Sequence, residues 1–212
     1  MAATANLIAP LFRAATVPSV HRFSVAEYHR MIRTGLLTED DRVELWEGVI
    51  VDKMAHNPPR DATVTRVQRR LARLVPEEWL IRVQCAITTR DSEPEPDLAI
   101  VSGPEEIYFN RHPSSRDIAL LIEVADTTLE TDRRDKVRMY AAVRVPVYWI
   151  INLNDRRIEV YTEPKGGKEP SYRQRTDFEI DAIVPLVING TEIAQIASID
   201  LLPPQAIERD KG

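Results

Sequence analysis

Residues 92–101, SEPEPDLAIV, and residues 118–125, IALLIEVA, decide the fold of this chain. In each stretch an acidic residue borders an apolar run: Asp97 directly precedes the run 98–101, and Glu123 directly follows the run 118–122. Continuous apolar runs of this kind are typical of buried central strands. A carboxylate beside such a strand needs a partner, because burying an unpaired charge is costly. The two stretches therefore predict buried strands with an acidic site at their ends.

The chemistry of such a site depends on how close the two carboxylates come. At about 4 Å their repulsion is roughly 4 kcal/mol at an effective dielectric of 20, so a cation or a shared proton must compensate. Oxygen ligands with open positions suit Mg²⁺ or Mn²⁺, which serve phosphoryl transfer by neutralising phosphate and activating water. On spacing alone a second interpretation stays open, in which each acid meets an arginine or caps a strand end.

Local patterns predict the remaining elements. Ser24 and Glu27 form a capping box ahead of a helix that ends at Gly35. Bulky apolar residues on both sides of Glu47-Gly48 predict a tight hairpin over 43–51. Further helices are expected at 61–75 and, from a capping-box pattern at 127–130, up to residue 142. Further strands are expected at 81–89, 147–153, 158–161, 172–180 and 183–187, with a hairpin loop at 163–170. The sum is an α/β (α+β) fold with a mixed sheet.

Length and composition limit the architecture and the partners. The 212 residues, 43% of them hydrophobic, predict one domain at 21–205 between a loose N-terminal tail, 1–20, and a C-terminal tail, 206–212. The net charge of −5 excludes a global cationic field, so any polyanion site must be local. No stretch approaches the roughly 20 apolar residues of a membrane span, and no membrane partner is expected. The single cysteine, Cys85, excludes an intramolecular disulfide and fits a reducing, cytoplasmic setting.

Four short motifs occur in order along the chain: SEPEPDLA (92–99), LIEV (121–124), DRRDK (132–136) and YWI (148–150). Together they resemble the Uma-type restriction endonuclease family of the PD-(D/E)XK nuclease superfamily, over about residues 23–202. The resemblance implies a restriction-endonuclease-like core, a central mixed sheet flanked by helices, with an additional N-terminal helix and hairpin and C-terminal strands. It also implies that an aspartate and a glutamate hold a divalent metal for phosphodiester hydrolysis.

Carried over residue by residue, the resemblance assigns the site. Asp97 matches the family's strand-start aspartate, Glu123 its strand glutamate, and Glu44 an acidic position in its first hairpin, so these three are the expected catalytic ligands of Mg²⁺ or Mn²⁺. Ala125 stands where the classical lysine of the superfamily would be. Lys136 on the following helix is therefore expected to supply the missing positive charge.

Other positions are assigned less directly. Asp61 and Val147 stand where the family is expected to favour histidine and glutamate, departures that could weaken activity. Gln84, Asp132 and Tyr140 are candidates for lining the acidic site. The four histidines show no paired metal spacing, so a histidine metal centre is not expected.

A basic stripe follows one face of the second predicted helix. Arg66, Arg69, Arg70 and Arg73 are spaced i, i+3, i+4 and i+7, which places them on one helix face. An acidic protein needs a local cationic surface to hold nucleic acid, so these arginines are the candidate nucleic-acid contacts. The alternative is an ordinary solvated helix face.

The function predicted from the sequence is a metal-dependent endonuclease that hydrolyses phosphodiester bonds in nucleic acid, with DNA as the expected partner. The alternative is a catalytically inactive nucleic-acid-binding or protein-interaction module on a nuclease scaffold, because fold does not fix function. A homodimer is expected for an active enzyme, since a small catalytic core needs two copies to cut both strands.

Overall fold

The computed structural model of the chain describes residues 20–204. Apart from Val20, the expected tails at 1–20 and 206–212 lie outside the described residues. None of the helices in the described part is long and apolar enough to cross a membrane.

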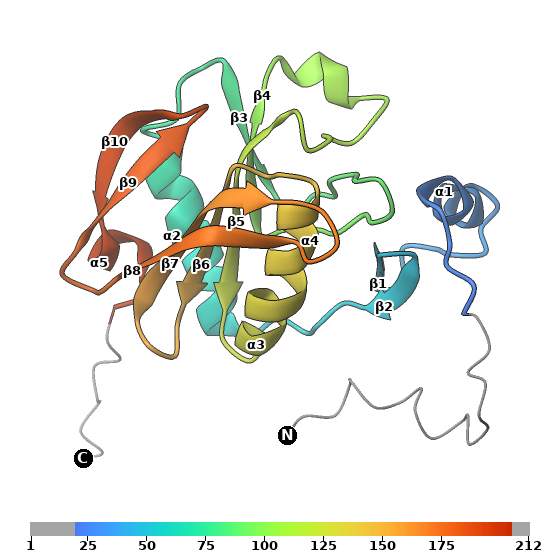
Figure 1. Cartoon of the computed structure of the whole chain (residues 1–212), viewed down its shortest axis with the longest axis horizontal. Helices are drawn as coiled ribbons and strands as arrows, with labels where there is room; N and C mark the ends of the chain where they lie inside the picture. The colour runs from blue at the N-terminus through green and yellow to red at the C-terminus, as the bar shows by residue number, and fades with distance from the viewer. Residues whose placement is uncertain (1–19, 205–212) are drawn as a thin grey trace.

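A six-stranded mixed sheet forms the centre of the molecule, in the order β3-β4-β5-β6-β7-β8 (Figure 1). The predicted runs at 98–101 and 118–125 become β4 and β5, which pair antiparallel. β5 and β6 pair in parallel, and every other neighbouring pair is antiparallel, so the predicted mixed sheet is confirmed. The strands are β3 (Trp79–Val83), β4 (Leu98–Ser102), β5 (Ile118–Ala125), β6 (Val147–Asn152), β7 (Arg157–Lys165) and β8 (Ser171–Phe178).

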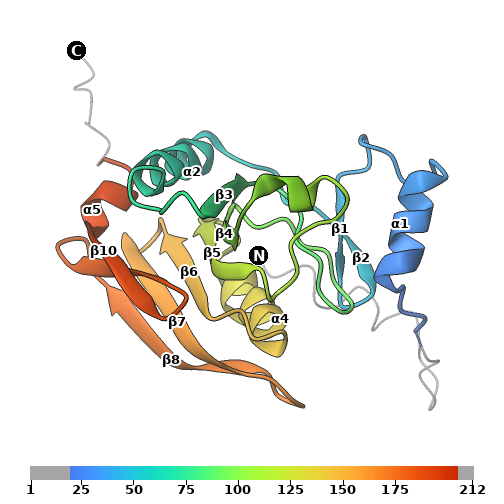
Figure 2. The same cartoon turned by 90° about the horizontal axis from the view of Figure 1, so that it is seen from above.

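Side-chain alternation along β5 separates two buried layers. Leu120 and Ile122 belong to the core beneath α2 (Pro58–Leu71), which contributes Val67. Leu121 faces the other layer, together with Met139 of α4 (Val137–Ala142). Figure 2 shows α2 and α4 on opposite sides of the sheet. Because alternate residues of a strand share a face, Glu123 points to the same side as Leu121, toward the α4 layer.

A helical crossover joins the parallel strands β5 and β6, as this connection requires. It consists of α3 (Leu129–Thr131), a π-helical turn, η3 (Asp132–Lys136), and α4. The predicted helix up to residue 142 is confirmed, but the predicted capping box is wrong. The Thr128 hydroxyl makes no cap bond and donates instead to Oδ2 of Asp132, at 2.7 Å. π-helical turns are frequent at functional sites.

The N-terminal helix and hairpin lie together at one end of the molecule (Figures 1 and 2). Ser24 and Glu27 form the predicted capping box of the helix. Glu47 and Gly48 both have positive φ, as the tight hairpin turn requires. An ion pair between Glu47 and Arg138 of α4 ties the hairpin to the body of the molecule, with Nη1 and Oε1 2.6 Å apart. The elements are α1 (Val25–Arg33), β1 (Val43–Trp46) and β2 (Val49–Asp52).

The C-terminal part lies on the same side of the sheet as α2. β9 (Ile183–Ile188) and β10 (Thr191–Ala197) form an antiparallel hairpin, followed by α5 (Ser198–Leu201). β9 is the predicted strand at 183–187. β10 and α5 were not predicted, because a bulge between Glu192 and Ala194 interrupts the strand alternation and one helical turn is too short for a periodic pattern.

Three predicted boundaries are wrong for identifiable reasons. The strand expected over 81–89 ends at Val83, because Gln84 has a φ of 48° and turns the chain out of the sheet. The second helix begins at Pro58, since proline is well tolerated in a first helical turn, and ends at Leu71. The hairpin loop expected at 163–170 shortens to 166–170, because β7 and β8 extend further than predicted. A short 3-10 turn, η2 (Glu105–Tyr108), follows β4.

Candidate active site

The two acidic residues of the central strands stand opposite each other. Leu98 and Ile122 are register partners in the antiparallel pair of β4 and β5, which places Asp97 across from Glu123. The backbone N–H of Val124 donates to Oδ2 of Asp97 at 2.8 Å and fixes that carboxylate. Both side chains are 1% exposed. The tertiary structure therefore brings together two carboxylates that are 26 positions apart in sequence.

Lys136 lies next to this pair. Its Nζ is 2.8 Å from Oε2 of Glu123 and 3.4 Å from Oδ1 of Asp132, one turn earlier in η3. It also lies 5.8 Å from the centre of the Trp46 ring, a cation–π distance. The ammonium thus reaches the glutamate from the following helix, while Ala125 is fully buried in the sheet.

Two further side chains orient the carboxylates. The Tyr140 hydroxyl donates to Oε1 of Glu123 at 2.9 Å from within the buried layer. The Trp46 indole N–H donates to Oε2 of Glu44 at 2.6 Å, and Glu44 is 8% exposed. Glu44 lies near enough to Lys136 to raise the pKa of its ammonium.

The electrostatics of the cluster follow from burial and from the number of acids. Burial alone would lower the pKa of Lys136, but the carboxylates of Glu123, Asp132 and Glu44 raise it above its ordinary value, so the ammonium stays charged. Burial raises the pKa of Glu123 to about 8, and Asp97 and Asp132 add to the rise while Lys136 opposes it. Burial likewise raises the pKa of Asp132 and of Glu44. The cluster therefore retains a proton near neutral pH and attracts additional positive charge.

Arg60 provides a second cation, which was not predicted as a site residue. Its Nη2 lies 2.7 Å from Oδ1 of Asp97, and its Nε donates to the carbonyl oxygen of Val124 at 3.2 Å. The alternative interpretation of the sequence, an acid paired with an arginine, is thus realised at Asp97. The sequence carried no signal for Arg60, because the helix was expected to begin at 61; in the structure Arg60 falls in the first turn of α2, where the helix dipole disfavours a cation and favours pairing with an acid.

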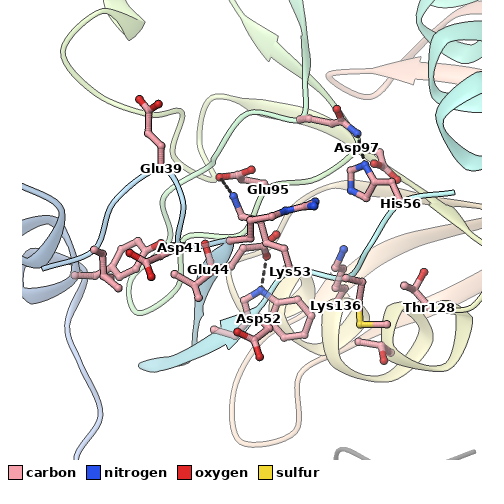
Figure 3. Close-up of a pocket in the computed structure, with 18 of the residues that line it drawn as sticks. Glu39, Asp41, Glu44, Asp52, Lys53, His56, Glu95, Asp97, Thr128 and Lys136 are labelled. Carbon is pink, nitrogen blue, oxygen red and sulfur yellow. Dashed lines mark hydrogen bonds and ion pairs between the residues drawn. The ribbon is translucent and has the colours of Figure 1, made fainter. Parts of the chain in front are cut away.

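A cleft of about 630 Å³ opens onto this cluster between the N-terminal hairpin, the start of α2 and η3 (Figure 3). Its lining includes the acidic and basic side chains Glu44, Asp97, Asp132, Lys136 and Arg60. Glu123 and Tyr140 do not line it, whereas Lys136, the ion-pair partner of Glu123, does. The cleft therefore reaches Asp97 and Lys136 directly.

Gln84 is among the residues that line the cleft. The amide nitrogen of Gln84 lies 3.3 Å from Nδ1 of His56, and Nδ1 of His56 is 3.2 Å from Oδ1 of Asp61. Asp61, one of the departures from the family pattern, is thus the partner of a nearby histidine. Val147, the other departure, is a buried residue at the start of β6.

The charge and the oxygen donors of the cluster decide whether it can hold a divalent ion. Four carboxylates face two cations, Lys136 and Arg60, which leaves a formal charge of −2 when all four acids are ionised. Oδ1 of Asp97 and Oδ1 of Asp132 are buried and accept no well-aligned hydrogen bond, but each lies in an ion pair, 2.7 Å from Arg60 and 3.4 Å from Lys136 respectively. Within residues 20–204, no three acidic, histidine or cysteine side chains already converge as a metal site. The residues fit Mg²⁺ or Mn²⁺ in charge and donor type, and side chains must shift to bind it. The four acids are Glu44, Asp97, Glu123 and Asp132.

The prediction that four arginines share one helix face is wrong for Arg73, because α2 ends at Leu71; Arg66, Arg69 and Arg70 lie on α2, and none of the four lines the cleft. Nε of Arg66 donates to the carbonyl oxygen of Asp200 at 2.8 Å, and Nη2 of Arg70 is 3.0 Å from the Asp200 carboxylate. These two arginines fasten α5 to α2. Arg69 and Arg73 are exposed and have no ion pair in the part of the chain that the structure describes.

The fold and this acidic cleft define a restriction-endonuclease-like α+β domain. A similar fold occurs in the crystal structure of a "putative nuclease" from Anabaena variabilis, with a TM-score of 0.60 and 18% sequence identity over 84% of this chain and 97% of that chain. At that identity the likeness shows the fold. The chain belongs to the Uma2 family, described as "Putative restriction endonuclease", whose profile matches residues 25–194. No curated protein matches the chain.

Proposed function

We propose that this chain is a metal-dependent endonuclease that hydrolyses phosphodiester bonds in nucleic acid, with DNA as its substrate. One observation carries the proposal: Asp97 and Glu123 face each other on adjacent central strands, with the Lys136 ammonium 2.8 Å from Glu123 beside an open cleft. Membership of the Uma2 family supports the nuclease class.

Asp97, Glu123 and Glu44 are the proposed holders of Mg²⁺ or Mn²⁺. When bound there, the ion supplies charge neutralisation at the phosphate and a more acidic water. Each of the three carboxylates is buried and lies near Lys136 or Arg60, so the acids of the cluster are only partly neutralised by the protein's own cations, and a divalent ion would add to that neutralisation.

Lys136 is the proposed group that orients the attacking water and stabilises charge developing on the phosphate. Asp132 and Glu123 hold its ammonium from two sides, and Tyr140 fixes Glu123 in turn. This support holds Lys136 at the inner wall of the cleft. A buried lysine with three neighbouring acids stays protonated, which suits charge stabilisation and not proton abstraction.

The contacts to nucleic acid are proposed to include the arginine stripe and the cleft rim at Gln84. Arg69 and Arg73 are the members of the stripe without an intramolecular ion pair, so they are the first candidates for phosphate contact. A homodimer would place two clefts on a duplex. A cytoplasmic setting suits a nuclease with a single cysteine.

A cleavage assay tests the proposal. The full chain is incubated with supercoiled plasmid and with single-stranded oligonucleotide in Mg²⁺, Mn²⁺ or EDTA, and products are resolved on gels. We expect metal-dependent cleavage that Asp97→Asn and Glu123→Gln abolish. Asp181→Asn makes the same carboxylate-to-amide change at an exposed position and should keep full activity.

The second candidate is a nucleic-acid-binding or protein-interaction module without turnover. The Arg60–Asp97 and Lys136–Glu123 ion pairs favour it, because they already partly neutralise the acids without a metal. Nucleic-acid binding without cleavage in any divalent ion would favour this candidate over the nuclease.

A further inference from the structure

Arg60 and the buried Asp97 form an ion pair beside the cleft. Oδ2 of Asp97 accepts from the Val124 N–H, and Oδ1 lies 2.7 Å from Nη2 of Arg60. Nε of Arg60 donates back to the Val124 carbonyl oxygen. The guanidinium therefore lies against the carboxylate oxygen that a metal ion would need.

The position of Arg60 is unfavourable except for this ion pair. The side chain is 14% exposed, and its Nη1 is buried without a hydrogen-bond partner. A buried N–H without an acceptor costs about 1–3 kcal/mol. The first turn of a helix also disfavours a positive charge. Arg60 is thus held by Asp97 and by the Val124 carbonyl oxygen, and moving its guanidinium into solvent would hydrate the unpaired Nη1.

Lys136, the other cation of the cluster, is held more firmly. It contacts Glu123 and Asp132 and lies near Glu44, whereas Arg60 has one acidic partner among the described residues. Arg60 also lines the cleft, so its guanidinium can move into solvent without crossing the core. Of the two cations, Arg60 is the one that an incoming ion would displace.

We propose that Arg60 is a built-in competitor for the metal: it is the counter-ion of Asp97 in the metal-free protein and must leave Asp97 before a divalent ion binds there. The inference rests on the proposed function, because it takes Asp97 as a ligand. Arg60 is a positioning residue that sets metal affinity through Asp97. A pair that is closed about nine-tenths of the time lowers the apparent metal affinity about tenfold.

Calorimetric titration of the full chain with Mn²⁺ tests this inference. Arg60→Gln should bind Mn²⁺ more tightly than the wild type, by about tenfold for a pair closed about nine-tenths of the time, because the competing charge is gone. Arg173→Gln removes the same charge from an exposed position on β8 and should leave the affinity unchanged. Unchanged or weaker binding by Arg60→Gln overturns the inference and makes Arg60 a simple clamp that aligns Asp97.

The double variant Arg60→Gln/Asp97→Asn separates this inference from the proposed function. If Asp97→Asn alone leaves Mn²⁺ affinity unchanged, Asp97 is no ligand, and both the metal site and the Arg60 inference fail. If Asp97→Asn weakens binding but Arg60→Gln does not strengthen it, only the Arg60 inference fails. When both hold, the gain from Arg60→Gln should vanish in the double variant.

A measurement on the wild-type protein covers the case in which Arg60→Gln does not fold. The Nε–Hε signal of Arg60 is followed by ¹⁵N NMR during titration with diamagnetic Mg²⁺, with Arg60→Lys providing the assignment. Displacement predicts faster hydrogen exchange at this group once Mg²⁺ is saturating. An unchanged exchange rate at saturation overturns the inference.

Discussion

Nζ of Lys136 lies 2.8 Å from Oε2 of Glu123, although the lysine is on the helix that follows the glutamate's strand. Two residues after Glu123 the strand has Ala125, which is fully buried. The π-helical turn η3 carries both Asp132 and Lys136 toward the sheet, so one turn supplies the cation and its supporting acid.

Loss of the Lys136 charge should reduce turnover more than binding. For Lys136→Met at saturating metal, we expect kcat to fall by about 10²–10³, the cost typical of losing one preorganised charge-stabilising group. Single-turnover cleavage with separately measured Mn²⁺ and DNA affinities checks this. Because the variant leaves buried carboxylates unpaired, its folding is verified by thermal unfolding in the presence of metal. Full kcat in a folded variant would remove Lys136 from the proposed reaction.

Substitutions of the three proposed metal ligands should weaken Mn²⁺ binding to different degrees. Asp97→Asn and Glu123→Gln should each weaken Mn²⁺ binding by more than about 100-fold. Loss of a residue that only supports a ligand costs up to about 100-fold, and loss of a direct ligand should cost more. Glu44→Gln should have a smaller effect, since the Glu44 carboxylate is held by Trp46 in the hairpin. Calorimetry gives the three affinities, with Asp181→Asn as the control. An equal and small effect at all three positions would contradict the metal site.

Stability without metal should fall as the pH rises. The pKa of Glu123 is raised from 4.5 to about 8 by burial, so between these values the folded state holds a proton that the unfolded state has lost. The free energy of unfolding therefore decreases as pH increases from about 5 to about 8, by at most about 1.4 kcal/mol per unit. Urea unfolding in EDTA at several pH values measures this slope. Glu123→Gln should flatten it, and an equal slope in the variant would place the titrating group elsewhere.

Within the arginine stripe, Arg69 and Arg73 should contribute to DNA binding, whereas Arg66 should contribute to stability. Replacing Arg69 and Arg73 by alanine should make the slope of log K against log salt less negative by about 0.9 for each lost phosphate contact on duplex DNA. Arg66→Ala should instead lower the melting temperature, because Arg66 fastens α5 through the carbonyl oxygen of Asp200. Fluorescence anisotropy at several salt concentrations and thermal unfolding make the two measurements. An unchanged salt slope in the Arg69/Arg73 variant assigns these side chains to a solvated face.

The central strands and the helices that pack on them could be predicted because their signals are local. The apolar runs at 98–101 and 118–125 became β4 and β5, and the Ser24–Glu27 capping box begins α1 as predicted. Predicted strand boundaries were wrong where the backbone conformation of one residue ends a strand that the pattern of its neighbours would continue. Gln84 ends β3 through its positive φ, which no apolar pattern records.

The sequence by itself identified Asp97 and Glu123 as acids that need partners, because a carboxylate at the end of an apolar strand is costly to bury unpaired. Only the tertiary structure decided what those partners are. Strand register placed Asp97 opposite Glu123, the π-helical turn brought Lys136 to Glu123, and the packing of α2 brought Arg60 to Asp97. Contacts of this kind join residues far apart in sequence, and their geometry depends on how helices and strands pack, which residue types and spacing do not encode locally.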